Sequence, residues 1–176
     1  MTRRLIAVDV ENLLGVEPAL ASDACWDAAV QGLVTQLDIR AGTDHVVIAA
    51  DPQWAFYAGK RMPTARLEVR SGASGADLAL CDALCDTAFL TQRYTEIVIA
   101  SGDHIFTASV HTLVASGLHV TVAAIPIHAS PELTAAADAV VWLRRPGAVL
   151  GELATIAVAD GMQSVAGGIR ALALAA

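Results

Sequence analysis

The first apolar run of the chain ends in two carboxylates and an amide. Residues 6–8 (Ile-Ala-Val) lead directly into Asp9, and Glu11 and Asn12 follow before the chain turns apolar again. A buried strand does not need an acid at its end, and ligands of open α/β sheets bind outside the carboxyl ends of the strands. This stretch is therefore the first candidate site.

Two further aspartates follow patterns that bring them to the same edge. Asp77 comes after the glycine- and serine-rich loop 71–75, in the expected first turn of a helix. Asp103 comes directly after the apolar segment 96–100, in the sequence Ser-Gly-Asp. Parallel strands point their carboxyl ends the same way, so Asp9, Asp77 and Asp103 are expected at one edge of a sheet.

Carboxylates that converge at one edge repel one another. At about 4 Å each pair costs about 1 to 4 kcal/mol, depending on the local dielectric constant, and a divalent cation offsets that repulsion. Ligands that are all oxygens suit Mg²⁺ or Mn²⁺ rather than zinc. Such an ion lowers the pKa of a bound water and stabilises charge on a reacting phosphate. Asn12 can orient a carboxylate or a water, and Ser101 can donate to a phosphate oxygen, so the residues indicate metal-dependent hydrolysis of a phosphodiester.

Apolar strand segments alternate with helical patterns along the whole chain. A first strand ends at Asp9, and further strands are expected at residues 45–50, 65–69, 96–100, 118–125 and 139–143. Helices are expected from Ser22 or Asp23 until Gly42 ends the helix, and from Pro52 to before Pro63. A third is expected from residue 76 through Phe89, with Leu78, Cys81, Leu84 and Cys85 facing the core, and others around residues 106–114 and over residues 131–137. This alternation predicts an α/β fold with a mainly parallel central sheet covered by helices on both faces.

The bulk composition fits one domain and argues against several protein classes. The chain has 176 residues, of which 55% are hydrophobic, and its net charge of −7 argues against a broad polyanion-binding surface. Cys25, Cys81 and Cys85 lack zinc spacing and indicate a reducing compartment. An uncharged apolar run of the roughly 20 residues that a membrane span needs is absent. These features predict a cytoplasmic protein without membrane contact.

Residues 144–147 (Arg-Arg-Pro-Gly) are typical of a boundary. We predict a domain of residues 1–145 and a C-terminal helical extension of residues 146–176. The extension is rich in alanine and valine, and its apolar character suggests a homodimer.

These motifs, in this order, resemble the NYN domain of the PIN-like ribonuclease superfamily. The resemblance covers roughly residues 4 to 143 and rests on residues 9–12 (Asp-Val-Glu-Asn), residues 75–77 (Gly-Ala-Asp) with Asp82 on the same helix, and residues 101–103 (Ser-Gly-Asp), with Asp138 also in the pattern.

The resemblance implies a three-layer α/β/α PIN-like, Rossmann-like fold and Mg²⁺- or Mn²⁺-dependent cleavage of RNA. It implies Asp9, Asp77 and Asp103 as metal ligands, with Asn12 and Asp82 as supporting catalytic residues.

One position departs from the pattern of that family. The family often has a further acid two residues after the aspartate of its Ser-Gly-Asp motif, and Ile105 stands there in this chain. An apolar side chain cannot bind a metal. The site therefore holds a single ion weakly, uses Asp82 or Glu11 instead, or is inactive.

Two other functions stay open at this point. A degenerate relative would bind RNA or a protein partner without cleavage, as Ile105 and the negative net charge suggest. A small-molecule phosphohydrolase of the haloacid dehalogenase type also has an Asp after its first strand, but it needs a second Asp two positions on, where this chain has Glu11.

Each acid also has a purely structural explanation. Asp9 with Asn12 can form a turn and cap, Asp77 can stabilise the first turn of its helix, and Asp103 can cap a helix. Taken alone, Asp82 suits a solvated helix face.

The remaining polar and aromatic candidates have similar alternatives. Asp51 ends the second strand and could line the same edge, but Pro52 after it favours a helix cap. His104 is either a substrate contact or an exposed loop residue. The basic residues near the third strand either contact phosphates or form a solvated face; they are Lys60, Arg61, Arg66 and Arg70. Phe56 and Tyr57 are expected in the core.

Overall fold

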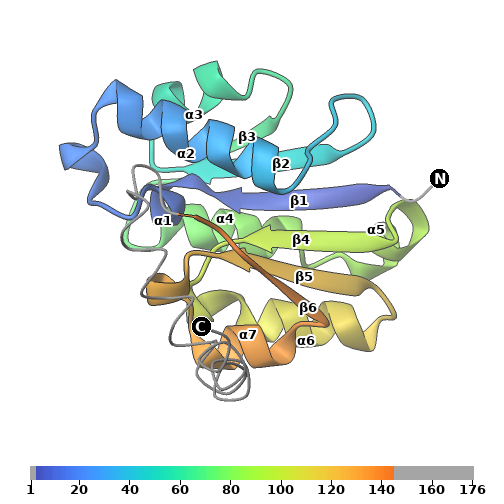
Figure 1. Cartoon of the computed structure of the whole chain (residues 1–176). Helices are drawn as coiled ribbons and strands as arrows, with labels where there is room; N and C mark the ends of the chain where they lie inside the picture. The colour runs from blue at the N-terminus through green and yellow to red at the C-terminus, as the bar shows by residue number, and fades with distance from the viewer. Residues whose placement is uncertain (1–2, 145–176) are drawn as a thin grey trace, which may run out of the picture. The chain divides into compact units, whose positions relative to one another are not determined.

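The computed structural model describes residues 3–144 and contains a six-stranded sheet in which every pairing is parallel (Figure 1). The strands lie in the order β3-β2-β1-β4-β5-β6. Their bounds are Arg4–Asp9 for β1, His45–Ala50 for β2, Arg66–Val69 for β3, Glu96–Ala100 for β4, His119–Ala124 for β5 and Ala139–Trp142 for β6. The predicted α/β class is confirmed. The predicted extension at 146–176, and with it the basis for a homodimer, lies outside the described residues.

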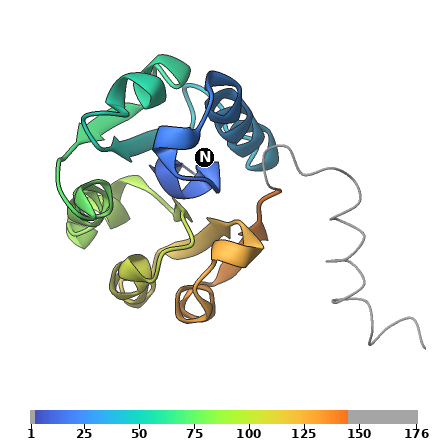
Figure 2. The ribbon, with the colours of Figure 1, turned by 90° about the vertical axis from the view of Figure 1, so that its left-hand side faces the viewer.

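Helices cover the sheet on both faces, which completes the three expected layers (Figure 2). One face carries α1 (Val10–Leu14), α2 (Asp23–Gln36) and α3 (Ala55–Arg61). The other carries α4 (Gly75–Ala83), α5 (Thr87–Arg93), α6 (Thr107–Ala115) and α7 (Pro131–Ala136). Short 3₁₀ turns lie at Pro18–Leu20, His104–Phe106 and Pro126–His128. No helix in the described part of the chain is long and apolar enough to cross a membrane.

Side chains of β1 alternate between the two cores. Ile6 and Val8 pack with Trp26 of α2 on one face, whereas Leu5 and Ala7 pack with Phe106 on the other. A strand that is buried on both faces has to be apolar at every position, which explains the continuous apolar run in the sequence. Asp9, the last residue of β1, is the polar exception among the buried positions of this strand, with 4% of its surface exposed.

The strand order reverses between β1 and β4. The chain moves outward from β1 through β2 to β3, then returns to β4 on the other side of β1 and moves outward again. In doubly wound sheets, the crevice at such a reversal is where ligands bind. Val8 pairs with Ala100, so Asp9 and Ser101 emerge side by side at the carboxyl ends of the two strands.

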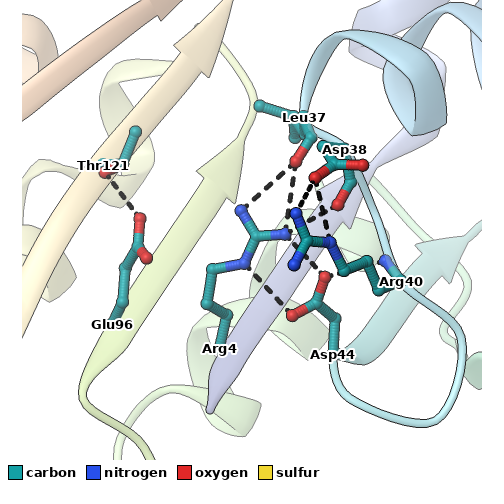
Figure 3. Close-up of polar contacts among 7 residues, drawn as sticks. All are labelled: Arg4, Leu37, Asp38, Arg40, Asp44, Glu96 and Thr121. Carbon is teal, nitrogen blue, oxygen red and sulfur yellow. Dashed lines mark hydrogen bonds and ion pairs between the residues drawn. The ribbon is translucent and has the colours of Figure 1, made fainter. Parts of the chain in front are cut away.

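Charged residues at the amino ends of the strands are paired (Figure 3). Arg4 at the start of β1 donates to both carboxylate oxygens of Asp44, at 3.1 and 2.6 Å, and to the carbonyl oxygen of Leu37 at 3.2 Å. On the neighbouring strands, Thr121 donates to Glu96 at 3.1 Å. Arg4 and Asp44 thus offset each other's charge, and Glu96 has a hydrogen-bond donor.

The helix expected from residue 76 through Phe89 is two helices. The α4 helix ends at Ala83, and α5 starts again at Thr87 because Asp86 caps it, accepting a hydrogen bond from the Phe89 N–H at 2.9 Å. A side chain that bonds the backbone in this way competes with a continuous helix.

The break alters which residues of this segment are buried. Leu84 is buried as expected. Leu78 and Phe89 are 40% and 47% exposed, and Cys85 is exposed, so the expectation that they face the core is wrong.

The segment after β2 also differs from the expectation. Asp51 accepts from the N–H of Gln53 at 3.0 Å and so caps a turn, while the α3 helix begins at Ala55. Tyr57 packs against the core, but Phe56 is 71% exposed, so its predicted place in the core is wrong.

At Gly102, after the end of β4, the backbone lies very close to the backbone of His128. A Cβ atom at this position would lie 2.4 Å from the carbonyl oxygen of His128. We expect Gly102→Ala to lower the free energy of unfolding by about 1 to 3 kcal/mol, because backbone has to move to admit the methyl group. Urea denaturation followed by circular dichroism measures this.

Gly32 inside α2 is the matched control, because a Cβ there meets only the side chain of Gln36 at 3.5 Å. Gly32→Ala should raise stability by about 0.5 to 1 kcal/mol. Equal effects of the two substitutions would contradict the close approach at Gly102.

Candidate functional site

A pocket of about 370 Å³ lies at the carboxyl ends of the strands. It is formed by the connections that follow β1, β2 and β3, together with Asp103 after β4. Its described lining contains five carboxylates and no Lys, Arg or His; the lining residues are Asp9, Glu11, Asn12, Asp51, Gln53, Trp54, Gly72, Ser74, Gly75, Ala76, Asp77 and Asp103. We call it the acidic pocket.

Asp9 lies at the base of this pocket and is held by two donors. Its carboxylate accepts from the backbone N–H of Asn12 at 3.2 Å, which caps α1, and from the hydroxyl of Ser101 at 2.9 Å. Burial, together with the negative charges of Asp77 and Glu11, raises the pKa of Asp9 to about 7, against the lowering effect of the two hydrogen bonds. Asp9 is therefore both the cap that the sequence suggested and a carboxyl group that ionises near neutral pH.

Asn12 and Ser101 tie the ends of β1 and β4 together. The Asn12 side-chain oxygen accepts from the backbone N–H of Gly102 at 3.0 Å. Ser101 donates to Asp9 and accepts from the backbone N–H of Asp103 at 3.1 Å. Ser101 is fully buried, so the expectation that its hydroxyl meets a phosphate is wrong, and it instead positions Asp9.

Asp77 interacts with both of the other aspartates. It lies in the first turn of α4, where burial raises its pKa and the charge of Asp103 raises it further, while hydrogen bonds with Asp9 and Ser74 lower it. Ser74 precedes the helix in a left-handed conformation, with φ of 54°. Asp77 thus links Asp9 to Asp103 electrostatically.

Asp103 lies in a more open position than Asp9. Its carboxylate accepts from the backbone N–H of Ile105 at 2.9 Å, which caps the 3₁₀ turn, and its side chain is 35% exposed. The exposed ring of His104 lies beside it, with Nδ1 3.0 Å from the carboxylate. The predicted capping role of Asp103 is present, and it leaves the side chain in the wall of the acidic pocket.

Glu11 joins the pocket from the same connection as Asp9. Its carboxylate accepts from the backbone N–H of Asp51 at 2.8 Å, and burial raises its pKa against that hydrogen bond. The contact fixes the loop after β2 to the loop after β1. The pocket lining also contains Gln53, Trp54 and Ser74, which the sequence patterns did not indicate. For Gln53 and Trp54, the turn that starts at Pro52 could have indicated their position.

Other candidates lie elsewhere. Asp82 forms an exposed ion pair with Arg70 at 2.8 Å and lines a separate groove between β3 and α4. Ile105 packs against the core on the α4–α7 face, so the position of the family's additional acid is filled by an apolar contact. Asp138 accepts from the backbone N–H of Val120 at the start of β5, at the opposite edge of the sheet.

The chemistry of the acidic pocket suits a hard divalent cation, although its geometry is not a finished coordination shell. All its candidate ligands are oxygens, and the pKa values of Asp9 and Asp77 are raised in part by neighbouring negative charge, which a cation would offset. Across residues 3–144, no three Asp, Glu, His or Cys side chains are grouped closely enough to hold a metal ion.

The fold contains a larger cavity with different chemistry. It measures about 690 Å³ and lies near the amino ends of β1 and β2. Asp44 is the carboxylate in its described lining, and it is paired with Arg4. Despite its size, this cavity offers no cluster of acids, so the acidic pocket remains the candidate site.

Comparisons with known proteins bear on the fold and the family. A family model described as the NYN domain matches residues 43–144, more than half of the chain. The match includes Asp77 and Asp103 and begins after Asp9, so it is shorter than the resemblance in the sequence. No curated protein matches the chain.

One similar solved structure is the crystal structure of a protein of unknown function, VPA0982, from Vibrio parahaemolyticus RIMD 2210633. It has a TM-score of 0.57 and 21% sequence identity, covering 81% of this chain and 93% of that chain. At this identity the likeness shows a shared fold alone.

The buried carboxyl of Asp9 predicts a pH-dependent stability. Its pKa is about 7 in the folded chain against an ordinary value of 3.8, so the wild type loses stability as pH rises from about 4 to about 7. We expect Asp9→Asn to raise the free energy of unfolding by about 2 to 4 kcal/mol at about pH 8 in a chelating buffer, and to give no such gain near pH 4. Thermal and urea unfolding measure the difference.

Asp38→Asn is the control, since the Asp38 side chain is 72% exposed and lies outside the acidic pocket. It should shift stability by less than about 1 kcal/mol at either pH. An Asp9→Asn gain that did not depend on pH would contradict the raised pKa.

Proposed function

We propose that this chain, which belongs to the NYN domain family, hydrolyses phosphodiester bonds of RNA in its acidic pocket with the help of Mg²⁺ or Mn²⁺. NYN membership indicates a PIN-like, nuclease-type fold. One observation carries the proposal: Asp9 is buried where the strand order reverses, and it shares with Asp77 and Asp103 a pocket without a basic side chain in the described lining.

In this proposal Asp9, Asp77 and Asp103 would hold the divalent ion, which would supply an activated water and stabilise charge on the phosphate. Ser101 and the Asn12 N–H fix the carboxylate of Asp9, so that it does not rotate out of the pocket. Asn12 in turn holds the Gly102 backbone and thereby the position of Asp103. Glu11 holds the loop that forms the opposite wall.

The pKa of Asp9 sets the pH range of this activity. Asp9 binds a cation in its ionised form, so metal binding should strengthen as pH rises through about 7. Asp77 also carries a raised pKa and contributes in the same direction.

A second candidate function is RNA binding without cleavage. Ile105 favours it, because this residue packs into the core where the family often has a further acid. A site with fewer acids holds metal more weakly. Turnover in the presence of metal separates the two functions.

Calorimetry and cleavage assays test the proposal together. We expect saturable Mn²⁺ or Mg²⁺ binding that is stronger at about pH 8 than at about pH 6, and metal-dependent cleavage of single-stranded RNA. Asp9→Asn and Asp103→Asn should each lower kcat/KM by about 100-fold or more, because each removes a charged ligand.

Asp82→Asn is the matched comparison on the same helix as Asp77, since Asp82 lies outside the acidic pocket. It should retain most of the activity. Cleavage that survives Asp9→Asn, or that is lost equally with Asp82→Asn, would contradict the assignment of the site. RNA binding without turnover in either metal would leave the second candidate function.

A further inference from the structure

The α3 helix, which follows the pocket-lining residues Gln53 and Trp54, exposes an aromatic side chain. Phe56 is 71% exposed and is the most exposed aromatic residue in the described part of the chain. Its ring lies edge-on to that of Tyr57, with centroids 6.1 Å apart, and the Lys60 ammonium lies 5.5 Å from the Phe56 centroid.

The spacing along α3 connects this pair to the pocket. The Ala55 N–H donates to the Asp51 carbonyl at 3.0 Å, so the turn before the helix already has helical bonding. Residues at i, i+3 and i+7 lie on one face of a helix. Gln53, Phe56 and Lys60 have that spacing, and Gln53 lines the acidic pocket. The face formed by these three residues therefore leads away from the pocket, and we call it the α3 track.

The Lys60 ammonium is available to a ligand. Its partner Asp23 is 3.3 Å away, and the two side chains are 36% and 65% exposed, so solvent weakens the pair. Asp23 also pairs with Arg61 at 3.0 Å, and the Arg61 side chain is only 7% exposed. Lys60 can therefore turn to a phosphate without leaving Asp23 unpaired.

We propose that the α3 track is a binding subsite for single-stranded RNA, in which a nucleobase stacks on Phe56 while Lys60 contacts a backbone phosphate. This inference rests on the proposed function of the acidic pocket. Proteins that bind single strands combine aromatic rings with basic groups, since every base has a face that can stack. In a duplex the bases already stack on one another, so the track selects unpaired RNA.

The α5 helix supplies a matched control. Phe89 and Arg93 have the same i, i+4 spacing as Phe56 and Lys60, with the Arg93 guanidinium 5.1 Å from the ring centroid and Phe89 47% exposed. This pair lines the cavity near the amino ends of the strands and lies outside the acidic pocket. If such pairs only stabilise their own helices, both will behave alike towards RNA.

The test is RNA affinity, measured by fluorescence anisotropy with a labelled, mixed-sequence single-stranded RNA. The parent is the full chain with Asp103→Asn, so that the RNA stays intact. We expect Phe56→Ala to weaken binding by about tenfold or more, with Phe56→Trp restoring it, and Phe89→Ala to have no such effect. Lys60→Ala should reduce the slope of log affinity against log salt by about 0.7, as loss of one phosphate contact requires.

Three results would overturn the subsite: equal losses for Phe56→Ala and Phe89→Ala, equal affinity for single strands and for a duplex of the same sequence, or no RNA binding by the parent at low salt. Absence of RNA binding would instead favour a protein partner as the ligand of the exposed Phe56 ring.

The subsite and the proposed function can fail separately. If the wild type cleaves no RNA but Phe56→Ala still weakens binding, the proposed catalytic function fails and the subsite stands. If the wild type cleaves RNA and Phe56→Ala leaves KM unchanged, the subsite fails and the catalytic function stands.

Discussion

Ser101 donates a hydrogen bond to the carboxylate of Asp9 at 2.9 Å, between two buried side chains at the ends of neighbouring strands. Burying a carboxyl group is unfavourable unless it is hydrogen-bonded or neutral. The donors that compensate Asp9 come from α1 and from the end of β4, so the contact also sets the relative positions of these segments. The hydrogen bond from the Gly102 N–H to the side chain of Asn12 also connects these two segments. The shape of the acidic pocket depends on this one arrangement.

The pKa values of carboxyl groups shift in opposite directions at the two edges of the sheet. At the amino edge, burial raises the pKa of Asp44, but the hydrogen bonds from Arg4 and the Arg40 N–H, with the positive charges of both arginines, keep it below its ordinary value. At the carboxyl edge, burial and neighbouring charge raise the pKa values of Asp9 and Asp77. Repulsion between carboxylates is thus concentrated at the carboxyl edge, where it lowers the stability of the folded chain. Perturbed carboxyl groups in a cleft are typical of functional sites, because a ligand can supply the compensation that the fold lacks.

Structural and functional explanations of these acids are compatible. Asp9 and Asp103 each cap a helical turn and also line the pocket, because a cap places its carboxylate at the end of a strand where the crevice opens. Asp82 shows the limit of reasoning from spacing. It lies on the same helix as Asp77, yet it faces Arg70 in another groove, because five residues along a helix is 140° of rotation past a full turn.

The sequence by itself determined the layers, the parallel sheet and the edge at which Asp9, Asp77 and Asp103 gather, because these follow from apolar periodicity and from the common direction of parallel strands. Only the tertiary structure decided that Gln53 and Trp54 line the pocket beside Asp51, that Ser101 is buried beneath it, and that Phe56 faces solvent. Local pattern specifies which residues form an element. The orientation of a side chain at the end of an element depends on contacts between segments far apart in the chain, such as that between Glu11 and Asp51.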